Sequence, residues 1–281
     1  MTLSASLSAL DDAVDAAAGL GLDTSRAERV LADARARLGF EGSAYVLALV
    51  GGTGVGKSSL LNALAGGVVS AAGARRPTTG SPVAWVARTA RDETAPLLRW
   101  LDVHELRDHA NGAFADVAIL DLPDVDSTTP EHRARVDKLL PRVDAVVWVA
   151  DPEKYRDAVL HDEYLRHWAP RLSRQLVVLN KADRIGPDAE RLREHLASSL
   201  RAEGIANVDV AVTSATRDGD THELRDWIAE GVEAKRVMSE RIAAELRGAA
   251  IDLATRAGVR SEATPLITAE QRARLLADVT R

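Results

Sequence analysis

Residues 51–58 have the side-chain types and the spacing that a phosphate-binding loop needs. They read Gly-Gly-Thr-Gly-Val-Gly-Lys-Ser, which fits the pattern of Gly, four residues, Gly, Lys and Ser or Thr. A phosphate group must come within hydrogen-bond reach of several backbone N–H groups, so bulky side chains are excluded there. We expect nucleotide contacts from Gly51, Gly52, Thr53, Gly54, Val55, Gly56, Lys57, Ser58 and Ser59.

Three side chains would bring charge and metal chemistry to this loop. Lys57 would reach the β- and γ-phosphates and is a candidate catalytic residue, and the Ser58 hydroxyl would bind Mg²⁺. Residues 117–123 read Val-Ala-Ile-Leu-Asp-Leu-Pro, an apolar strand that ends near Asp121. Phosphate-loop enzymes hold Mg²⁺ through a second acidic group of this kind, so Asp121 is a candidate metal ligand.

The flanking sequence predicts a strand before the loop and a helix after it. Residues 43–50 form a short apolar run with strand propensity, as expected of a buried strand. Leu60, Leu61 and Leu64 follow with helical spacing. A helix in this place points the positive end of its dipole at the anion. A Gly-rich turn in another fold is the alternative, which the order of strand, loop and helix disfavours.

The tetrapeptide Asn180-Lys181-Ala182-Asp183 follows the apolar run 175–179 and predicts guanine recognition. Guanine presents two neighbouring N–H donors, which one carboxylate, that of Asp183, can accept together. Adenine lacks this pair of donors and would leave the carboxylate unpaired, which disfavours an ATPase. Lys181 would pack its stem along the base and ribose, and Asn180 would brace the neighbouring loops.

A turn of small residues completes the predicted base site. Ser214, Ala215 and Thr216 follow the apolar run 208–212, and a backbone N–H group there would reach guanine O6.

In this order and spacing the motifs resemble the GTPases of the translation-factor-related class, over roughly residues 43–230. The resemblance implies an α/β fold, a three-layer P-loop G domain with a mostly parallel sheet, that binds GTP or GDP with Mg²⁺. Within this class the chain looks like the bacterial Era-like and dynamin-like GTPases, because of Arg-Pro-Thr-Thr at 76–79 and Asp-Leu-Pro at 121–123. The run 151–155, Asp-Pro-Glu-Lys-Tyr, is also similar to a bacterial subfamily of this group.

The resemblance places the first switch between the first helix and the strand at 82–86. Thr79 would be its Mg²⁺-binding and catalytic threonine, with Thr78 as the alternative. Arg76 lies three residues before Thr79, a spacing similar to that of heterotrimeric G-protein α subunits, where an Arg acts in cis on the γ-phosphate. Arg75 would take this place if Thr78 binds the metal. Both arginines as solvated switch residues are the alternative.

Three positions depart from the family pattern. Asp124 stands where the third motif usually has Gly; its backbone N–H can still meet a γ-phosphate, which makes it a candidate catalytic residue. Its carboxylate should repel the phosphate unless it turns away or contacts water or metal. Val125 stands where Ras-like enzymes keep a water-orienting Gln, and Gly54 lacks the side chain through which some relatives bind a catalytic K⁺ or Na⁺. We therefore expect slow hydrolysis without a partner.

The chain divides into three predicted parts: a helical segment at 1–42, a G domain at 43–231 and a second helical segment at 232–281. Apolar residues recur with helical spacing before and after the G domain, and the stripe after it contains Met238, Ile242, Leu246, Ala249 and Leu253. The flanking helices either form a bundle, as in dynamin-like proteins, or pack separately on the G domain. The polar stretch 126–135 is expected to be a mobile second switch.

Composition is that of an ordinary globular protein, with 46% hydrophobic and 28% charged residues. The formal net charge of −6 disfavours a general nucleic-acid-binding surface, and no sequence-specific nucleic-acid motif is evident. The absence of Cys, of a secretory signal and of a long apolar run leads us to expect a cytoplasmic protein, with peripheral membrane association under one alternative.

Two functions follow from the resemblance. The first is a Mg²⁺-dependent switch that binds guanine nucleotides and hydrolyses GTP to GDP. The second is a dynamin-like protein that self-associates through the G domain near a membrane, with hydrolysis stimulated across the dimer. The sequence does not determine the downstream partner, for which a membrane and a ribosome are the two candidates.

Overall fold

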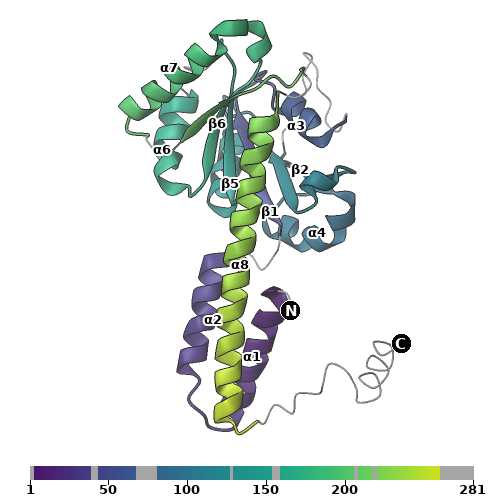
Figure 1. The fold of residues 1–281 in the computed structure, drawn as a ribbon, viewed down its shortest axis with the longest axis vertical. Helices are drawn as coiled ribbons and strands as arrows, with labels where there is room; N and C mark the ends of the chain where they lie inside the picture. The colour runs from purple at the N-terminus through teal and green to yellow at the C-terminus, as the bar shows by residue number, and fades with distance from the viewer. Residues whose placement is uncertain are drawn as a thin grey trace, which may run out of the picture. The chain divides into compact units, whose positions relative to one another are not determined.

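The computed structural model describes residues 3–38, 44–67, 81–126, 129–153, 159–205, 208–217 and 220–259 (Figure 1). They divide into two compact units. One unit is Leu38–Ser239, and the other combines Met1–Arg37 with Glu240–Arg281. Thr78, Thr79, Arg75 and Arg76 lie outside the described residues.

The larger unit is built on a seven-stranded sheet in the order β3-β2-β4-β1-β5-β6-β7. All neighbours pair in parallel except β2 and β4, which are antiparallel. Every residue of β1, β5 and β6 is buried, which explains why these strands are continuous apolar runs. The strands are β1 (Tyr45–Gly51), β2 (Val83–Ala87), β3 (Glu105–His109), β4 (Val117–Asp121), β5 (Ala145–Ala150), β6 (Gln175–Leu179) and β7 (Asp209–Val212).

Helices cover both faces of this sheet, so the unit has the expected three layers. Alternate residues of β1 enter two separate apolar clusters, as the two-residue period of a strand requires. One cluster contains side chains from α4 (Arg91–Trp100), α5 (Pro130–Leu139) and α7 (Ala189–Ala202). The other contains side chains from α3 (Lys57–Ala65) and from the first turns of α8 (His222–Arg256).

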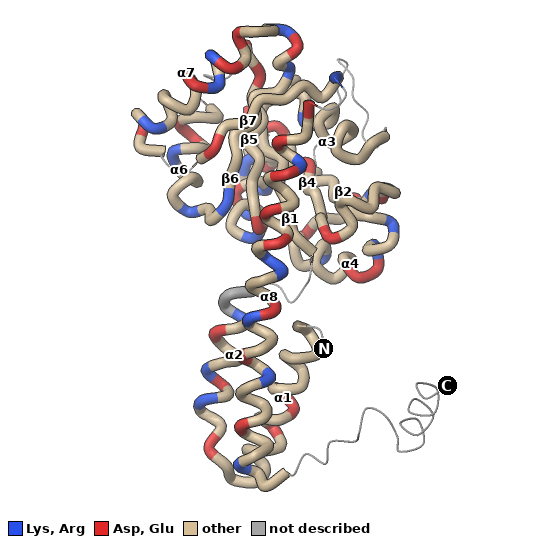
Figure 2. Tube along the Cα trace, viewed as in Figure 1, with Lys and Arg blue, Asp and Glu red and all other residues tan. Residues whose placement is uncertain are grey.

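Shorter helical segments connect these elements. A π-helix at Val159–Leu165 leads into α6 (Arg166–Trp168), and 3-10 turns occur at Arg88–Ala90, Gly112–Phe114, Leu140–Arg142, Ala169–Arg171, Ala182–Arg184 and Gly186–Asp188. Trp85 and Trp148 lie in the core and are 2% and 0% exposed. The helix α7 carries charges of both signs (Figure 2).

The smaller unit contains α1 (Leu3–Gly19), α2 (Ser25–Leu38) and the last turns of α8. Arg256 donates to the Asp23 carbonyl at 2.9 Å, and Arg26 lies 3.8 Å from Asp252. The flanking helices therefore pack on one another. Its apolar interior consists of Leu7, Leu10, Val14, Ala17, Ala27, Leu31, Ala34, Ile242, Ala243, Leu246 and Leu253.

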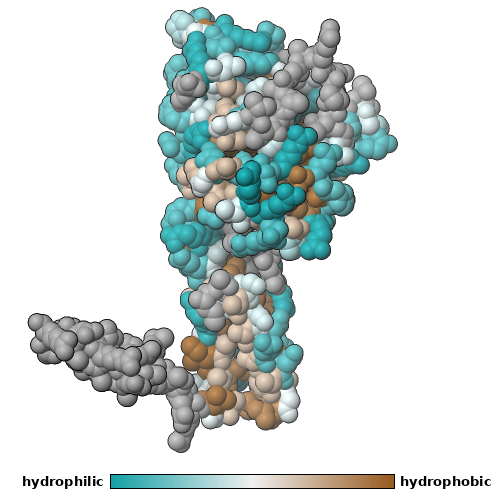
Figure 3. Space-filling model, turned by 90° about the vertical axis from the view of Figure 1, so that its right-hand side faces the viewer, coloured by the Kyte–Doolittle hydropathy of each residue, from teal (hydrophilic) through white to brown (hydrophobic). Residues whose placement is uncertain are grey.

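Two details of the helical stretches differ from expectation. Met238 was placed on the buried stripe but is 40% exposed. The helix expected from Val232 begins at His222, because Leu224 and Ile228 already pack on the sheet. Apolar residues also lie on the surface, as the brown areas of Figure 3 show, and in the smaller unit these include Leu20, Ile251 and Val259. Within the described ranges, no helix has the length and apolar character needed to span a bilayer.

Candidate nucleotide-binding site

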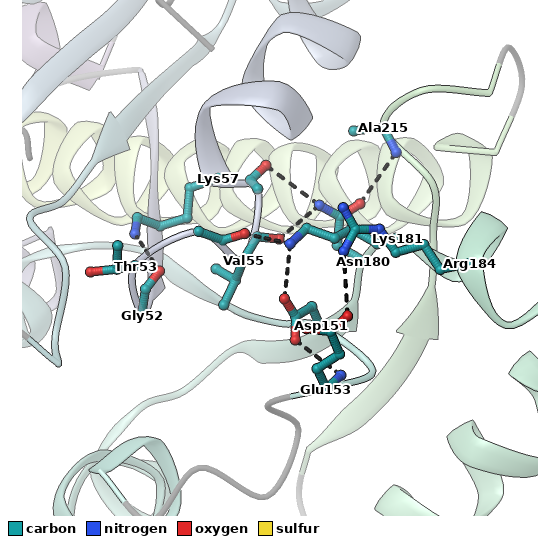
Figure 4. A network of polar contacts seen from close by, with 12 residues as sticks. Gly52, Thr53, Val55, Lys57, Asp151, Glu153, Asn180, Lys181, Arg184 and Ala215 are labelled. Carbon is teal, nitrogen blue, oxygen red and sulfur yellow. Dashed lines mark hydrogen bonds and ion pairs between the residues drawn. The ribbon is translucent and has the colours of Figure 1, made fainter. Parts of the chain in front are cut away.

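The predicted site residues meet at one edge of the sheet. The phosphate loop follows β1, and Asp121 ends the neighbouring strand β4. On the other side of β1, Asp151 follows β5 and Asn180 follows β6. Because these strands are parallel, their carboxyl ends bring the four segments together. Figure 4 shows three of them, the phosphate loop with Asp151 and Asn180.

The glycines of the loop make room for the chain's own atoms. A Cβ atom on Gly51 would lie 2.4 Å from the Val149 carbonyl oxygen, and one on Gly56 would lie 2.4 Å from Asn180 Nδ2. Gly56 also has a φ of +97°, in the left-handed region. Gly51 is thus required for the packing of the loop against β5, and Gly56 for its packing against the guanine motif. The close approach of a phosphate is a second reason for glycine at these positions.

Lys57 is held inside the loop, with 7% of the residue exposed. Its Nζ donates to the carbonyl oxygens of Gly51 and Gly52 at 2.8 and 3.3 Å. It also pairs with Asp124 Oδ1 at 2.5 Å. The ammonium group is therefore directed along the inner side of the loop.

The Asp124 carboxylate faces the loop and contacts cationic and polar groups of the chain. Besides Lys57, it accepts a hydrogen bond from Thr53 Oγ1 at 2.8 Å. Val125 is 1% exposed and its backbone N–H donates to the Gly51 carbonyl, so its side chain belongs to the core.

Asp126 is a site residue that the sequence did not reveal as one. Its two carboxylate oxygens lie 2.8 and 3.0 Å from the Thr53 backbone nitrogen, and Thr53 Oγ1 is 2.9 Å from Oδ1. The only sequence signal is the repeated acid in Asp-Leu-Pro-Asp-Val-Asp. The stretch 126–135, expected to be a mobile second switch, includes the first residues of α5, which starts at Pro130, and its mobility stays a prediction.

Asp121 and Ser58 form the candidate metal site. Asp121 is 3% exposed, and the Ser58 hydroxyl lies 3.5 Å from Asp121 Oδ2. Asp121 Oδ1 is buried with no hydrogen-bond partner among the residues that the structure describes. Burial raises the pKa of the Asp121 carboxyl above its usual value, and the Lys57 charge opposes this rise. An unpaired buried carboxylate oxygen beside a hydroxyl fits Mg²⁺, which takes one or two protein oxygens and fills its shell with water and phosphate.

Asn180 links the phosphate loop to the turn after β7. It is 1% exposed; its Nδ2 donates to the Val55 carbonyl at 3.0 Å, and its Oδ1 accepts from the Ala215 backbone N–H at 3.2 Å. One amide side chain thus satisfies backbone groups from two loops that are 160 positions apart in sequence, residues 55 and 215.

Asp183 lies beside that turn. The Ser214 hydroxyl donates to Asp183 Oδ1 at 2.6 Å, and the Ser214 and Thr216 hydroxyl oxygens are 3.1 Å apart. The Ser214 hydrogen bond lowers the pKa of the Asp183 carboxyl. The group is therefore ionised at neutral pH, as an acceptor of two guanine donors must be.

Lys181 has a partner that the sequence did not predict. Its Nζ donates to the Gly54 carbonyl at 2.5 Å and to Asp151 Oδ2 at 2.9 Å, and Asp151 is 3% exposed (Figure 4). Asp151 Oδ1 accepts the backbone N–H of Glu153. A carboxylate directly after an apolar strand was the available signal for this contact.

Comparison with known proteins agrees with this geometry. Residues 46–181 match the family model of the 50S ribosome-binding GTPases. One chain of an oligomerised bacterial dynamin pair aligns with a TM-score of 0.53 and 16% identity, over 99% of this chain and 51% of its own. This chain thus spans about half the length of that dynamin. No match was found among proteins of curated function.

Two structures of Era were also found. Era in complex with MgGDPNP and nucleotides 1506–1542 of 16S ribosomal RNA aligns with a TM-score of 0.49 and 21% identity, over 68% of this chain and 57% of its own. Aquifex aeolicus Era bound to GDP and AlF4⁻ aligns with a TM-score of 0.46 and 22% identity, over 67% and 56%.

A phosphate loop after the first strand of a mostly parallel, helix-covered sheet defines the P-loop α/β class. With the family match at residues 46–181, the larger unit contains the fold and the motifs of the P-loop GTPases, a family that binds GTP.

Proposed function

We propose that this chain is a Mg²⁺-dependent guanine-nucleotide switch that hydrolyses GTP to GDP. The observation that carries the proposal is the link through Asn180, which joins the phosphate loop at Val55 to the turn at Ala215. Phosphate recognition and base recognition are thereby coupled within one rigid edge of the sheet. Asp183, ionised and beside the same turn, supplies the acceptor for guanine.

Different residues would bind the phosphates, bind the metal ion and assist hydrolysis. Lys57 and the loop amides would hold the phosphates, and Ser58, Asp121 and Thr79 would hold Mg²⁺, which neutralises charge on the β- and γ-phosphate oxygens when bound. Val125, buried in the core, cannot orient a water molecule. We therefore propose slow hydrolysis unless Arg76, or a residue of a partner, stabilises the transferring phosphoryl group.

The test of guanine recognition is Asp183→Asn. The variant loses the charged acceptor of the paired donors, which should cost about 2–5 kcal/mol of GDP affinity, measured by calorimetry with ADP as the competing ligand. Asp188→Asn, at an exposed position five residues away, is the matched control and should bind GDP as the parent does. GDP affinity retained in Asp183→Asn would contradict the proposed base site.

A second candidate function is a dynamin-like assembly protein. The alignment with the bacterial dynamin covers 99% of this chain, so it includes the helical unit as well as the G domain. That protein is described as an oligomerised pair that senses and tethers membranes. The two functions differ in one measurement, the GTP hydrolysis rate per molecule. A rate that rises with protein concentration supports assembly through the G domain, and a constant rate supports the monomeric switch.

A further inference from the structure

Two carboxylates of the chain contact the phosphate loop through its own donor groups. Asp124 pairs with Lys57 Nζ, and Asp126 accepts the Thr53 backbone N–H. The Thr53 hydroxyl lies within hydrogen-bond distance of both carboxylates, and its single hydrogen serves one of them at a time. Gly52 permits the approach, because a Cβ there would lie 3.0 Å from Asp126 Oδ2.

These contacts use the full donor capacity of Lys57. An ammonium group has three hydrogens, and Lys57 Nζ has three acceptors: the carbonyls of Gly51 and Gly52, and Asp124. The carbonyls belong to the loop itself, whereas Asp124 follows β4 on a separate segment. A phosphate oxygen that binds Lys57 must therefore replace one of the three, and Asp124 is the one that can leave without unfolding the loop.

The contacts of the two carboxylates fall on Thr53 and Lys57, and none of those described falls on the backbone amides of 55–58 that lead into α3. A diphosphate can use these amides at the helix N-terminus. The third phosphate depends most on the lysine. Competition from the carboxylates therefore acts more strongly on GTP than on GDP.

We propose that Asp124 and Asp126 are internal competitors of the γ-phosphate, and that they set the preference of the site between GTP and GDP. GTP binding exchanges one anion for another at Lys57 and releases the side chains of Asp124 and Asp126 from the loop, while Val125 stays in the core. Since α5 begins at Pro130, shortly after Asp126, this exchange is the step that would transmit the presence of the third phosphate to the rest of the domain. This inference rests on the proposed nucleotide site and assigns its specificity.

The test compares affinities for GDP and for a non-hydrolysable GTP analogue, with Mg²⁺ present, in the parent, Asp124→Ala, Asp126→Ala and the double variant. Removing a charge-assisted contact from Lys57 should raise the ratio of GTP-analogue to GDP affinity by about tenfold in the double variant. Asp124→Asn keeps the shape and removes the charge, so it should shift the ratio in the same direction with less disturbance of the fold.

Asp144→Ala is the matched control. Asp144 pairs with Lys235 at 2.7 Å and accepts a backbone N–H from Val46, but it precedes β5, at the opposite edge of the sheet. It should leave the ratio unchanged. A ratio within about twofold of the parent in the double variant and in Asp124→Asn, or equal gains for both nucleotides, would overturn the inference while the proposed function stands. A parent that binds neither nucleotide would overturn both.

Discussion

At the scale of single residues, Asp121 Oδ1 is the atom whose surroundings best fit the proposed cation. It is buried without a hydrogen-bond partner among the described residues, and a buried polar atom of this kind costs about 1–3 kcal/mol. The Ser58 hydroxyl, 3.5 Å from the other carboxylate oxygen, is too far for a strong hydrogen bond of its own. A metal ion between the two groups would satisfy both.

Ser58→Asn should therefore weaken nucleotide binding through the metal. Chelation of Mg²⁺ is expected to weaken GDP binding by the parent about tenfold or more, and that of the Ser58 variant about twofold or less, because the variant no longer benefits from the ion. Lys57→Ala is the control, since it removes a phosphate contact and should keep the parent's sensitivity to chelation. Equal sensitivity of parent and Ser58→Asn would exclude the metal role.

The sequence predicted which polar residues lie at the carboxyl ends of the strands, but it did not predict which groups on other loops their side chains contact. Asp121 and Asn180 each follow an apolar run, so parallel pairing was enough to bring them to one edge. Asp126 and Asp151 bind groups on other segments, Thr53 and Lys181, and no spacing in the sequence states which loop amide or amine a side chain meets. The role of Arg76 stays a prediction.

At the scale of elements, α8 shows how a tertiary contact decides whether a glycine inside a helix stabilises or destabilises the protein. Gly231 and Gly248 both lie inside this helix, where Gly costs about 1 kcal/mol relative to Ala. At Gly231 a Cβ would lie 2.3 Å from Tyr45 Oη and 2.6 Å from Tyr45 Cζ. Tyr45 is 2% exposed in β1, so its ring is enclosed by neighbouring atoms and cannot easily move away.

Gly231→Ala should thus destabilise the protein, by about 1–3 kcal/mol from overpacking, in spite of the gain in helix propensity. Gly248→Ala is the matched control on the same helix. Nothing lies within 4 Å of its Cβ position, so the variant should be stabilised by up to about 1 kcal/mol. Urea unfolding of the two variants and the parent measures both effects. A Gly231→Ala protein as stable as the parent would show that the helix can shift from β1 at little cost.

At the scale of the whole molecule, the strands and the three-layer fold were predictable because each buried strand is a separate apolar run. The extent of α8 was not. Its residues belong to both compact units, and the expected boundary at 231–232 falls where the helix continues without a break. Helical periodicity shows which face is apolar, but it does not show which neighbour covers that face.

For the smaller unit we predict that its removal lowers the local stability of α8 but leaves nucleotide binding nearly unchanged. Deletion of residues 1–37 removes α1 and α2, whose buried residues include Leu10 and Leu31, while Ile242 and Leu253 remain on α8. Ile242 and Leu253, each 1% exposed in the full chain, would lose their apolar neighbours. Amide exchange of α8 from residue 242 onward should therefore speed up, and binding of a hydrophobic dye should rise. GDP affinity should change by about threefold or less, because the described site residues all lie in the other unit.

Leu20→Ala in the full chain, at a residue 68% exposed, is the control and should change none of these readouts. Unchanged exchange in the truncated protein would show that α8 is stable without α1 and α2, and a large loss of GDP affinity would show that the helical unit supports the nucleotide site.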